Sequence, residues 1–148
     1  MKNLTLLANL FPSGVFSRKK RLRWENDIDQ AKELANNESR VILLFFQIPD
    51  RKTSHYDVEK NVFNTDEFIS CAGKNLVMLR VNFPLKKKNA LSEERQKRNN
   101  LLADRYNPQG IFPYAVILDK EGVVLGETLY LQTSANEFIK RLDIYRGC

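Results

Sequence analysis

Short apolar runs recur along this chain and predict its strands. The run VILLFF occupies residues 41–46, and the run LVMLRVNF occupies residues 76–83. Runs of this length that are apolar on both faces are typical of buried parallel strands, so we expect residues 41–46 to form a central strand. A third strand is predicted over 114–118. A hairpin turn at 119–122, where Gly122 can take positive φ, would lead to a return strand over 123–128.

Apolar residues at helical spacing fill the intervals between these runs. A first helix is predicted over 24–37, with an inward stripe of Trp24, Ile28, Ala31, Leu34 and Ala35. A second should begin near Ser54, with Asp57 as its capping-box acid, and the chain should restart a helix at Asn64.

Two further serines predict helix starts late in the chain. Ser92 should cap a helix anchored by Leu101, Leu102 and Tyr106. Ser134, with Glu137 three residues on, should open the last helix. The inward residues of that last helix are expected to be Phe138, Ile139, Leu142 and Tyr145.

The order of elements predicts an α/β fold. The expected architecture is a mixed sheet of about four strands with helices on both faces. Helical crossovers join the first strands, and a hairpin closes the sheet. We expect one domain over residues 24–148, preceded by a basic extension over residues 1–23.

Charge is concentrated in that extension. The net charge is +6, and residues 1–24 hold six basic and no acidic residues, so the rest of the chain is balanced. Nucleic acid or a membrane surface is therefore expected as a partner only through the basic arm from Arg18 to Arg23. The alternatives for the extension are a loosely packed segment or a cleaved signal, although its charges follow its apolar patch. The run Lys86-Lys87-Lys88 is either a solvated loop or a binding patch.

The chain has few residues of the types that serve as thiol redox groups or soft metal ligands. The chain has two cysteines, Cys71 and Cys148, and one histidine, His55. This set predicts no metal site and no cofactor. Cys71 is expected to be buried and Cys148 exposed, and either is a candidate free thiol.

Several segments resemble the thioredoxin fold, and in particular the thioredoxin-like bacterial proteins of the DsbH type. The matching pieces are Trp24, Ala31, Ala35, Ile42 to Phe46, Asp50, Val62-Phe63, Phe68, Val81 to Pro84, Glu94 to Lys97, Gly110 with Pro113, and Leu118-Asp119 with Gly122. The resemblance covers the chain from Trp24 onward. It implies a thiol–disulfide oxidoreductase ancestry and an exported, periplasmic location as the alternative to the cytoplasm.

The active-site motif of that family is replaced here. In the ungapped register, Lys52 and His55 take the places of the two motif cysteines, and Arg51 takes the place of the tryptophan. A lysine cannot form a mixed disulfide and a histidine cannot resolve one, so we expect no dithiol–disulfide exchange in the loop from Asp50 to His55. Lys52, Thr53 and Ser54 could hold an anion at the helix N-terminus, or simply cap the helix.

Pro113 matches the cis-proline of the family. The resemblance implies a cis Phe112–Pro113 bond beside the motif loop, with Phe112 and Pro113 lining a groove for an extended peptide. The sequence therefore predicts a redox-inactive binding, adaptor or chaperone-like protein whose partner is a protein or extended peptide. The alternative is residual thiol chemistry through Cys71 or Cys148.

Overall fold

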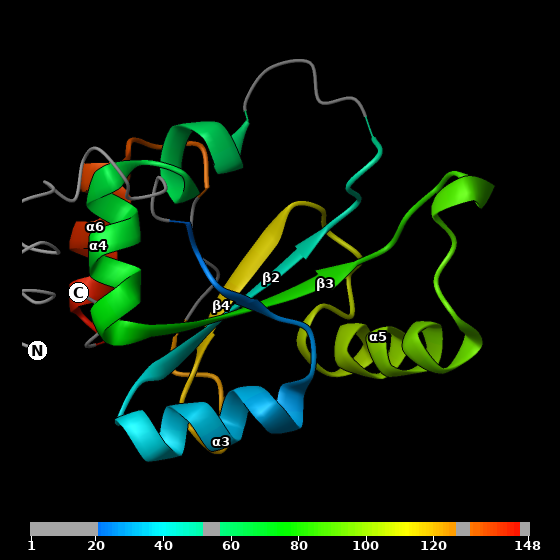
Figure 1. The fold of residues 1–148 in the computed structure, drawn as a ribbon, viewed down its shortest axis with the longest axis horizontal. Helices are drawn as coiled ribbons and strands as arrows, with labels where there is room; N and C mark the ends of the chain where they lie inside the picture. Colours follow the sequence, from blue (N-terminus) through cyan, green and yellow to red (C-terminus); the bar gives the residue numbers. More distant parts are fainter. Residues whose placement is uncertain (1–20, 52–56, 127–130, 146–148) are drawn as a thin grey trace, which may run out of the picture.

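The computed structural model describes residues 21–51, 57–126 and 131–145. Four strands form one mixed sheet in the order β1-β3-β2-β4 (Figure 1). They are β1 (Trp24–Glu25), β2 (Val41–Gln47), β3 (Leu76–Asn82) and β4 (Tyr114–Leu118). β3 pairs in parallel with both β1 and β2, while β4 runs antiparallel to β2. The expected fold class and the central position of β2 are confirmed.

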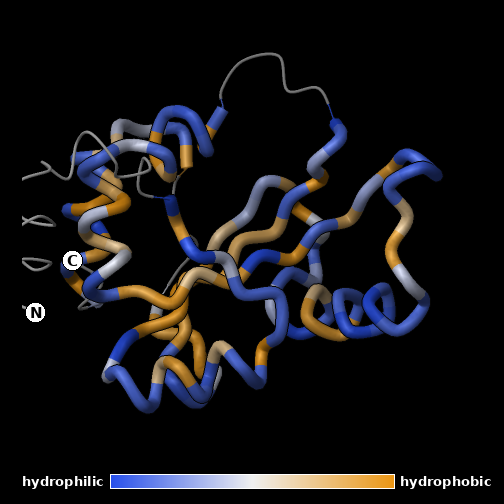
Figure 2. The backbone as a smooth tube through the Cα atoms, viewed as in Figure 1, coloured by the Kyte–Doolittle hydropathy of each residue, from blue (hydrophilic) through white to orange (hydrophobic). Residues whose placement is uncertain are grey.

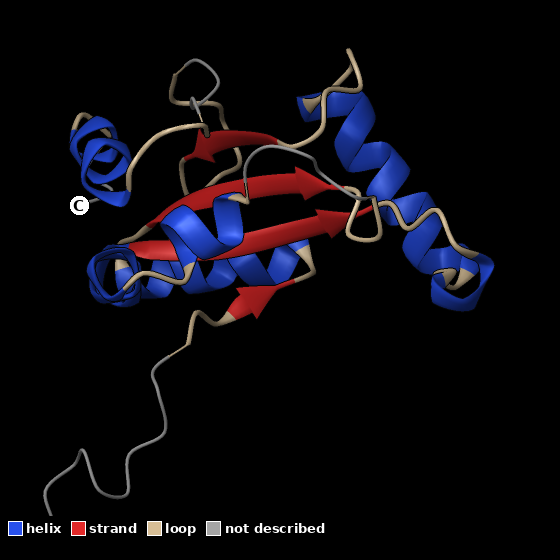
Figure 3. Cartoon of the chain, turned by 90° about the horizontal axis from the view of Figure 1, so that it is seen from above, coloured by secondary structure: helices blue, strands red, loops and turns tan. Residues whose placement is uncertain are grey.

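Helices pack on both faces of this sheet (Figure 3). Their bounds are α3 (Ile28–Glu38), a π-helical turn at Glu59–Phe63, α4 (Asp66–Asn75), a 3₁₀ turn at Lys87–Asn89, α5 (Glu93–Tyr106) and α6 (Ala135–Asp143). None of the helices in the described ranges is long and apolar enough to cross a membrane.

The sheet separates two apolar cores because alternate residues of its strands point to opposite faces. On one face, Leu43 and Phe45 pack with the π-helical turn, α4 and α6. On the other face, Ile42, Leu44 and Phe46 pack with α3 and α5. Figure 2 shows hydrophobic residues along the strands, and hydrophobic and hydrophilic residues in alternation along the helices. β2 is apolar at every inner position because both of its faces are covered.

The prediction that the first helix begins at Trp24 is wrong. Trp24 lies in β1, opposite Met78, and not on the first helix, which begins after Asp27. Asp27 accepts hydrogen bonds from the amides of Asp29 and Gln30, so it is the cap that starts α3. The indole of Trp24 packs near Phe45 and Phe63, on the face opposite to Ala31 and Ala35.

Two caps differ from the prediction. Asp57 Oδ1 accepts hydrogen bonds from the amides of Glu59 and Lys60, so Asp57 itself caps the turn rather than lying at a third helical position. α4 is capped by the Thr65 hydroxyl and not by Asn64. Ser54 lies outside the described residues.

The expected return strand is mostly absent from residues 123–126, the part of it that the structure describes. Leu118 and Val124 form an isolated antiparallel bridge, and the Leu125 amide donates to the Ile117 carbonyl. The turn before it forms as expected, with Gly122 at φ +86° and Asp119 Oδ1 accepting from the amides of Glu121 and Val123. The fourth strand of the described sheet is β1, at the edge beside β3, and not the return strand expected next to β4.

The late helices begin as predicted. Ser92 Oγ accepts from the Arg95 amide, and Ser134 Oγ accepts from the Glu137 amide. Leu101 is a wrong core assignment, since its side chain is exposed. Asn99 is buried instead, and its Nδ2 donates to the Asn82 carbonyl.

Candidate functional site

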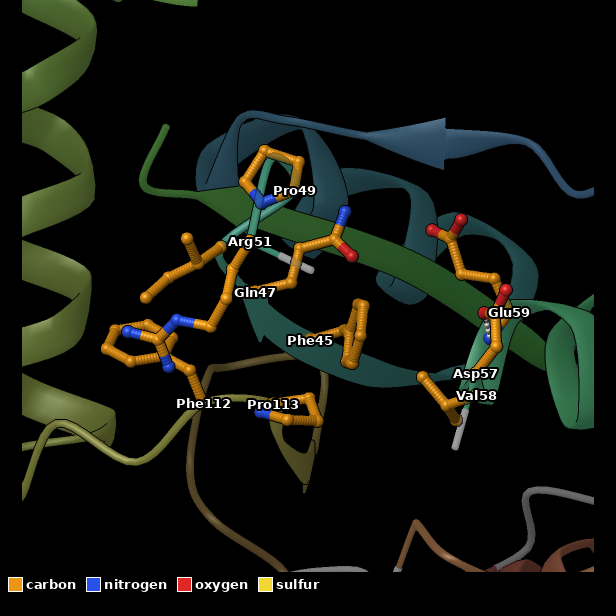
Figure 4. A pocket seen from close by; sticks show the side chains of 10 residues that line it. Phe45, Gln47, Pro49, Arg51, Asp57, Val58, Glu59, Phe112 and Pro113 are labelled. Atoms are coloured by element: carbon orange, nitrogen blue, oxygen red, sulfur yellow. Dashed lines mark hydrogen bonds between the residues drawn. The ribbon is translucent and has the colours of Figure 1, made fainter. Parts of the chain in front are cut away.

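A pocket opens where β2 ends and the π-helical turn begins. Its volume is about 370 Å³, and Figure 4 shows the side chains that line it. The lining residues are Phe45, Gln47, Ile48, Pro49, Arg51, Asp57, Val58, Glu59, Phe112 and Pro113. Phe45 and Val58 are buried and supply apolar surface together with Ile48, Pro49, Phe112 and Pro113, while the other lining residues are polar or charged.

Charges of opposite sign lie on opposite sides of this pocket. In Figure 4, Arg51 lies with Phe112 on one side, and Asp57 and Glu59 lie on the other. The Asp57 carboxylate is occupied in part by the helix amides that it caps. The pocket therefore presents a guanidinium on one side and carboxylates on the other.

The segment before β4 forms one wall of the pocket. The peptide bond between Phe112 and Pro113 is cis. The loop ahead of it is held by Asn107, whose Nδ2 donates to the Ile111 carbonyl at 2.9 Å and whose Oδ1 accepts from the Ile111 amide at 3.1 Å. Asn107 is buried and α5 ends at it, so the C-terminus of α5 positions the Phe112–Pro113 wall.

The loop after β2 is held from the opposite side by Asp50. Its carboxylate accepts hydrogen bonds from the amides of Leu85 and Lys86 at 2.8 Å each and from Asn89 Nδ2 at 3.0 Å. These donors, led by the Leu85 amide, lower the pKa of Asp50 to about 2. Asp50 is therefore a positioning residue for the loop and is not among the residues that line the pocket.

Glu59 connects the pocket to the sheet behind it. Glu59 Oε1 lies 3.7 Å from Nη2 of Arg80, and the Arg80 guanidinium stacks 4.1 Å from the ring centroid of Trp24. Burial lowers the pKa of Arg80, and the Glu59 carboxylate opposes that shift. An arginine side chain is a cation in proteins, so Arg80 partly compensates the charge of Glu59.

Comparison with known proteins shows which proteins this chain is similar to in sequence and fold. No family model matches the chain. Over 101 residues the chain is 33% identical to the disulfide bond reductase DsbH of Chlamydia pneumoniae, and the match covers 68% of this chain and 58% of that relative. A solved DsbH oxidoreductase gives a TM-score of 0.74 at 26% identity, covering 84% of this chain and 83% of the other. The chain has a thioredoxin-like fold close to the DsbH-type proteins.

More distant structures share the same fold. A thioredoxin from Thermus thermophilus gives a TM-score of 0.59 at 21% identity, covering 84% of this chain and 86% of its own. The expected resemblance is thereby confirmed at the level of the fold. The chain spans somewhat more than half the length of the curated DsbH relative that it matches.

Of the loop from Asp50 to His55, where the sequence predicts a replaced motif, the structure describes only the first two residues. Asp50 and Arg51 lie as described above, while Lys52, Thr53, Ser54 and His55 lie outside the described residues, as do Arg18 to Lys20 of the basic arm. The sequence has no cysteine at any of the positions from 50 to 55. In the described ranges, no group of three or more His, Cys, Asp or Glu side chains could hold a metal ion.

Cys71 differs from both predictions made for it. It is half-buried in α4 rather than fully buried, and it is disulfide-bonded rather than a free thiol. It is not one of the residues that line the pocket at the end of β2. Cys148, the second cysteine of the sequence, lies outside the described residues.

Several of the site residues were not predicted from the sequence, among them three polar ones. Gln47, Glu59 and Asn107 reach or support the pocket only because β2, the π-helical turn and the end of α5 converge there. Asn107 offered a partial signal, since an asparagine shortly before Gly110 is typical of a structured turn. Gln47 and Glu59 resemble ordinary polar surface residues in the sequence.

Proposed function

We propose that this protein binds extended polypeptide segments at the pocket beside Phe112 and Pro113, without covalent capture. The observation that carries the proposal is the pocket between the end of β2 and the cis-peptide wall, in a chain with no cysteine at positions 52 and 55. Backbone hydrogen bonds to the peptide would supply affinity, and the pocket would admit one side chain. The protein would serve as an adaptor or chaperone-like module.

The loss of thiol chemistry at the motif is tested by insulin reduction. We expect no turnover above the uncatalysed rate, since neither Lys52 nor His55 can form a mixed disulfide. The matched control is the double variant Lys52→Cys with His55→Cys, which should gain activity on the same scaffold. Turnover by the native chain comparable to that of a thioredoxin would overturn this part of the proposal.

Peptide binding is tested separately with a permanently unfolded model protein as the probe. We expect amide chemical shifts to move at Gln47 and Phe112, and we expect Phe112→Ala to weaken binding by about fivefold or more. Leu101→Ala, an exposed change on α5, is the control. Equal affinity in the two variants, or no shift at the pocket, would refute the assignment.

A second candidate function is thiol–disulfide exchange away from the motif, favoured by the disulfide-bonded state of Cys71. Such a disulfide would oxidise a dithiol partner and become reduced itself. Intact mass after alkylation, with and without a dithiol reductant, measures whether it opens, and Cys71→Ser is the control. A bond that resists reduction in the folded protein would exclude this function. The exported location stays a prediction.

A further inference from the structure

An arm of the chain, residues 84–91, projects beside the loop after β2 (Figure 1). Its structure is fixed by the three hydrogen bonds that it gives to Asp50. Two backbone bonds within the 3₁₀ turn, from Asn89 to Lys86 and from Ala90 to Lys87, add to this. The arm is therefore a preformed surface, which lowers the ordering cost of binding a partner.

The arm and the first two turns of α5 line a second, open pocket of about 460 Å³. We call it the arm pocket. Its apolar lining residues are Pro84, Leu85, Ala90 and Leu91, and Leu85 is 63% exposed. Its rim is mainly basic, from Lys86, Lys87 and Lys97, with Glu93 as the one acidic lining residue. Hydrophilic residues gather at the tip of the arm beside this apolar stretch (Figure 2).

The basic rim has no acidic partner in the described ranges. None of Lys86, Lys87 and Lys97 forms an ion pair there, whereas other surface cations such as Arg98 and Lys140 do. The Asp50 carboxylate is directed to amide donors of the arm. An exposed leucine that shares a pocket with ammonium groups without an ion pair in the described ranges is complementary to an apolar side chain flanked by carboxylates.

We propose that the arm pocket binds an acidic peptide segment that carries one large apolar side chain. The apolar side chain would cover Leu85 and Leu91, and the flanking carboxylates would face Lys87 and Lys97. A single-stranded nucleic acid fits less well, because such strands use aromatic stacking and no aromatic residue lines this pocket. Glu93 at the rim also opposes a dense run of phosphates. This surface is separate from the groove at Pro113 and stands whether or not that groove binds peptides.

The test uses the full chain and a short fluorescein-labelled peptide with one leucine between runs of glutamate, followed by anisotropy at low salt. The double variant Lys87→Glu with Lys97→Glu should weaken binding by about tenfold or more. The matched control, Lys74→Glu with Lys120→Glu, changes the net charge equally at exposed positions outside the arm and should weaken it by less than about twofold.

A second pair of changes tests the apolar lining residues. Leu85→Ser in the protein and leucine-to-serine in the probe should each weaken binding by about fivefold, and together by little more than either alone. The thermal midpoint of each variant checks that it is folded. The proposal is overturned if both charge variants lose affinity equally. Equal binding of the serine probe or of a single-stranded oligonucleotide, or no binding of the leucine probe at millimolar concentration, would overturn it too.

Discussion

The carboxylate of Asp50 accepts a hydrogen bond of 2.8 Å from the backbone amide of Leu85, 35 residues away in the sequence. This bond joins the loop after β2 to the arm after β3. It brings the polar pocket at the end of β2 and the arm pocket to neighbouring positions. A single carboxylate thereby positions two surfaces that the sequence presents as unrelated loops.

The hydrogen bonds from the arm should lower the pKa of Asp50 to about 2, below the ordinary aspartate value of 3.8, so its carboxyl group should titrate around pH 2. The folded pKa is depressed, so the stability from Asp50 is present above pH 4 and is lost as the pH falls toward 2. Carboxyl NMR titration measures this midpoint. A midpoint near 3.8 would show that the amide bonds do not persist in solution.

Asp50→Asn should lower the thermal midpoint at neutral pH, because the neutral amide accepts hydrogen bonds less strongly than a carboxylate. The difference from the native chain should narrow as the pH falls below 4. Asp104→Asn, at an exposed position on α5, is the control and should leave the midpoint unchanged. A pH-independent difference would contradict the role of the Asp50 charge.

Phe63 is expected to be the most costly aromatic residue to remove. Its ring contacts those of Trp24, Phe45, Phe68 and Phe138, at centroid distances of 5.0 to 6.0 Å. Phe63→Ala should lower the free energy of unfolding by about 3–5 kcal/mol. Urea denaturation measures it, with Leu101→Ala expected to cost less than about 0.5 kcal/mol. Equal costs would mean that Phe63 is not central to this core.

Trp24 is the only tryptophan of the chain, so its fluorescence reports on the stacking of Arg80. Arg80→Met should shift the emission and destabilise the fold by about 1–2 kcal/mol, because Glu59 loses its cation. Arg80→Lys should restore part of the stability, since it keeps the charge without the planar stack. Unchanged emission and stability in Arg80→Met would show that this stack is not maintained in solution.

Asn107 should matter for both stability and peptide binding. Asn107→Ala removes both hydrogen bonds to Ile111 and should lower the free energy of unfolding by about 1–3 kcal/mol. It should also weaken binding at the Phe112–Pro113 wall. Asn100→Ala, which removes an exposed hydrogen bond from Gln96, is the matched control. Loss of stability with unchanged affinity would limit Asn107 to a structural role.

Much of the fold follows from local pattern. β2, β3 and β4 were predictable because each is a short apolar run, and α5 and α6 because a serine cap precedes each. β1 was not predictable from a window of sequence, because two residues form a strand only by pairing with Met78 and Leu79. The helical spacing of Trp24 to Ile28 was coincidental.

For the candidate site, too, some features follow from the sequence and others only from the tertiary structure. The sequence alone determines that no cysteine stands at positions 52 and 55, and that Phe112 and Pro113 precede a strand. Only the tertiary structure decides that Glu59 meets Arg80, that Asn107 holds the wall of the pocket, and that Asp50 holds the arm. The reason is physical: apolar periodicity and helix caps act within a few residues, whereas these contacts join segments that meet only once the sheet has formed.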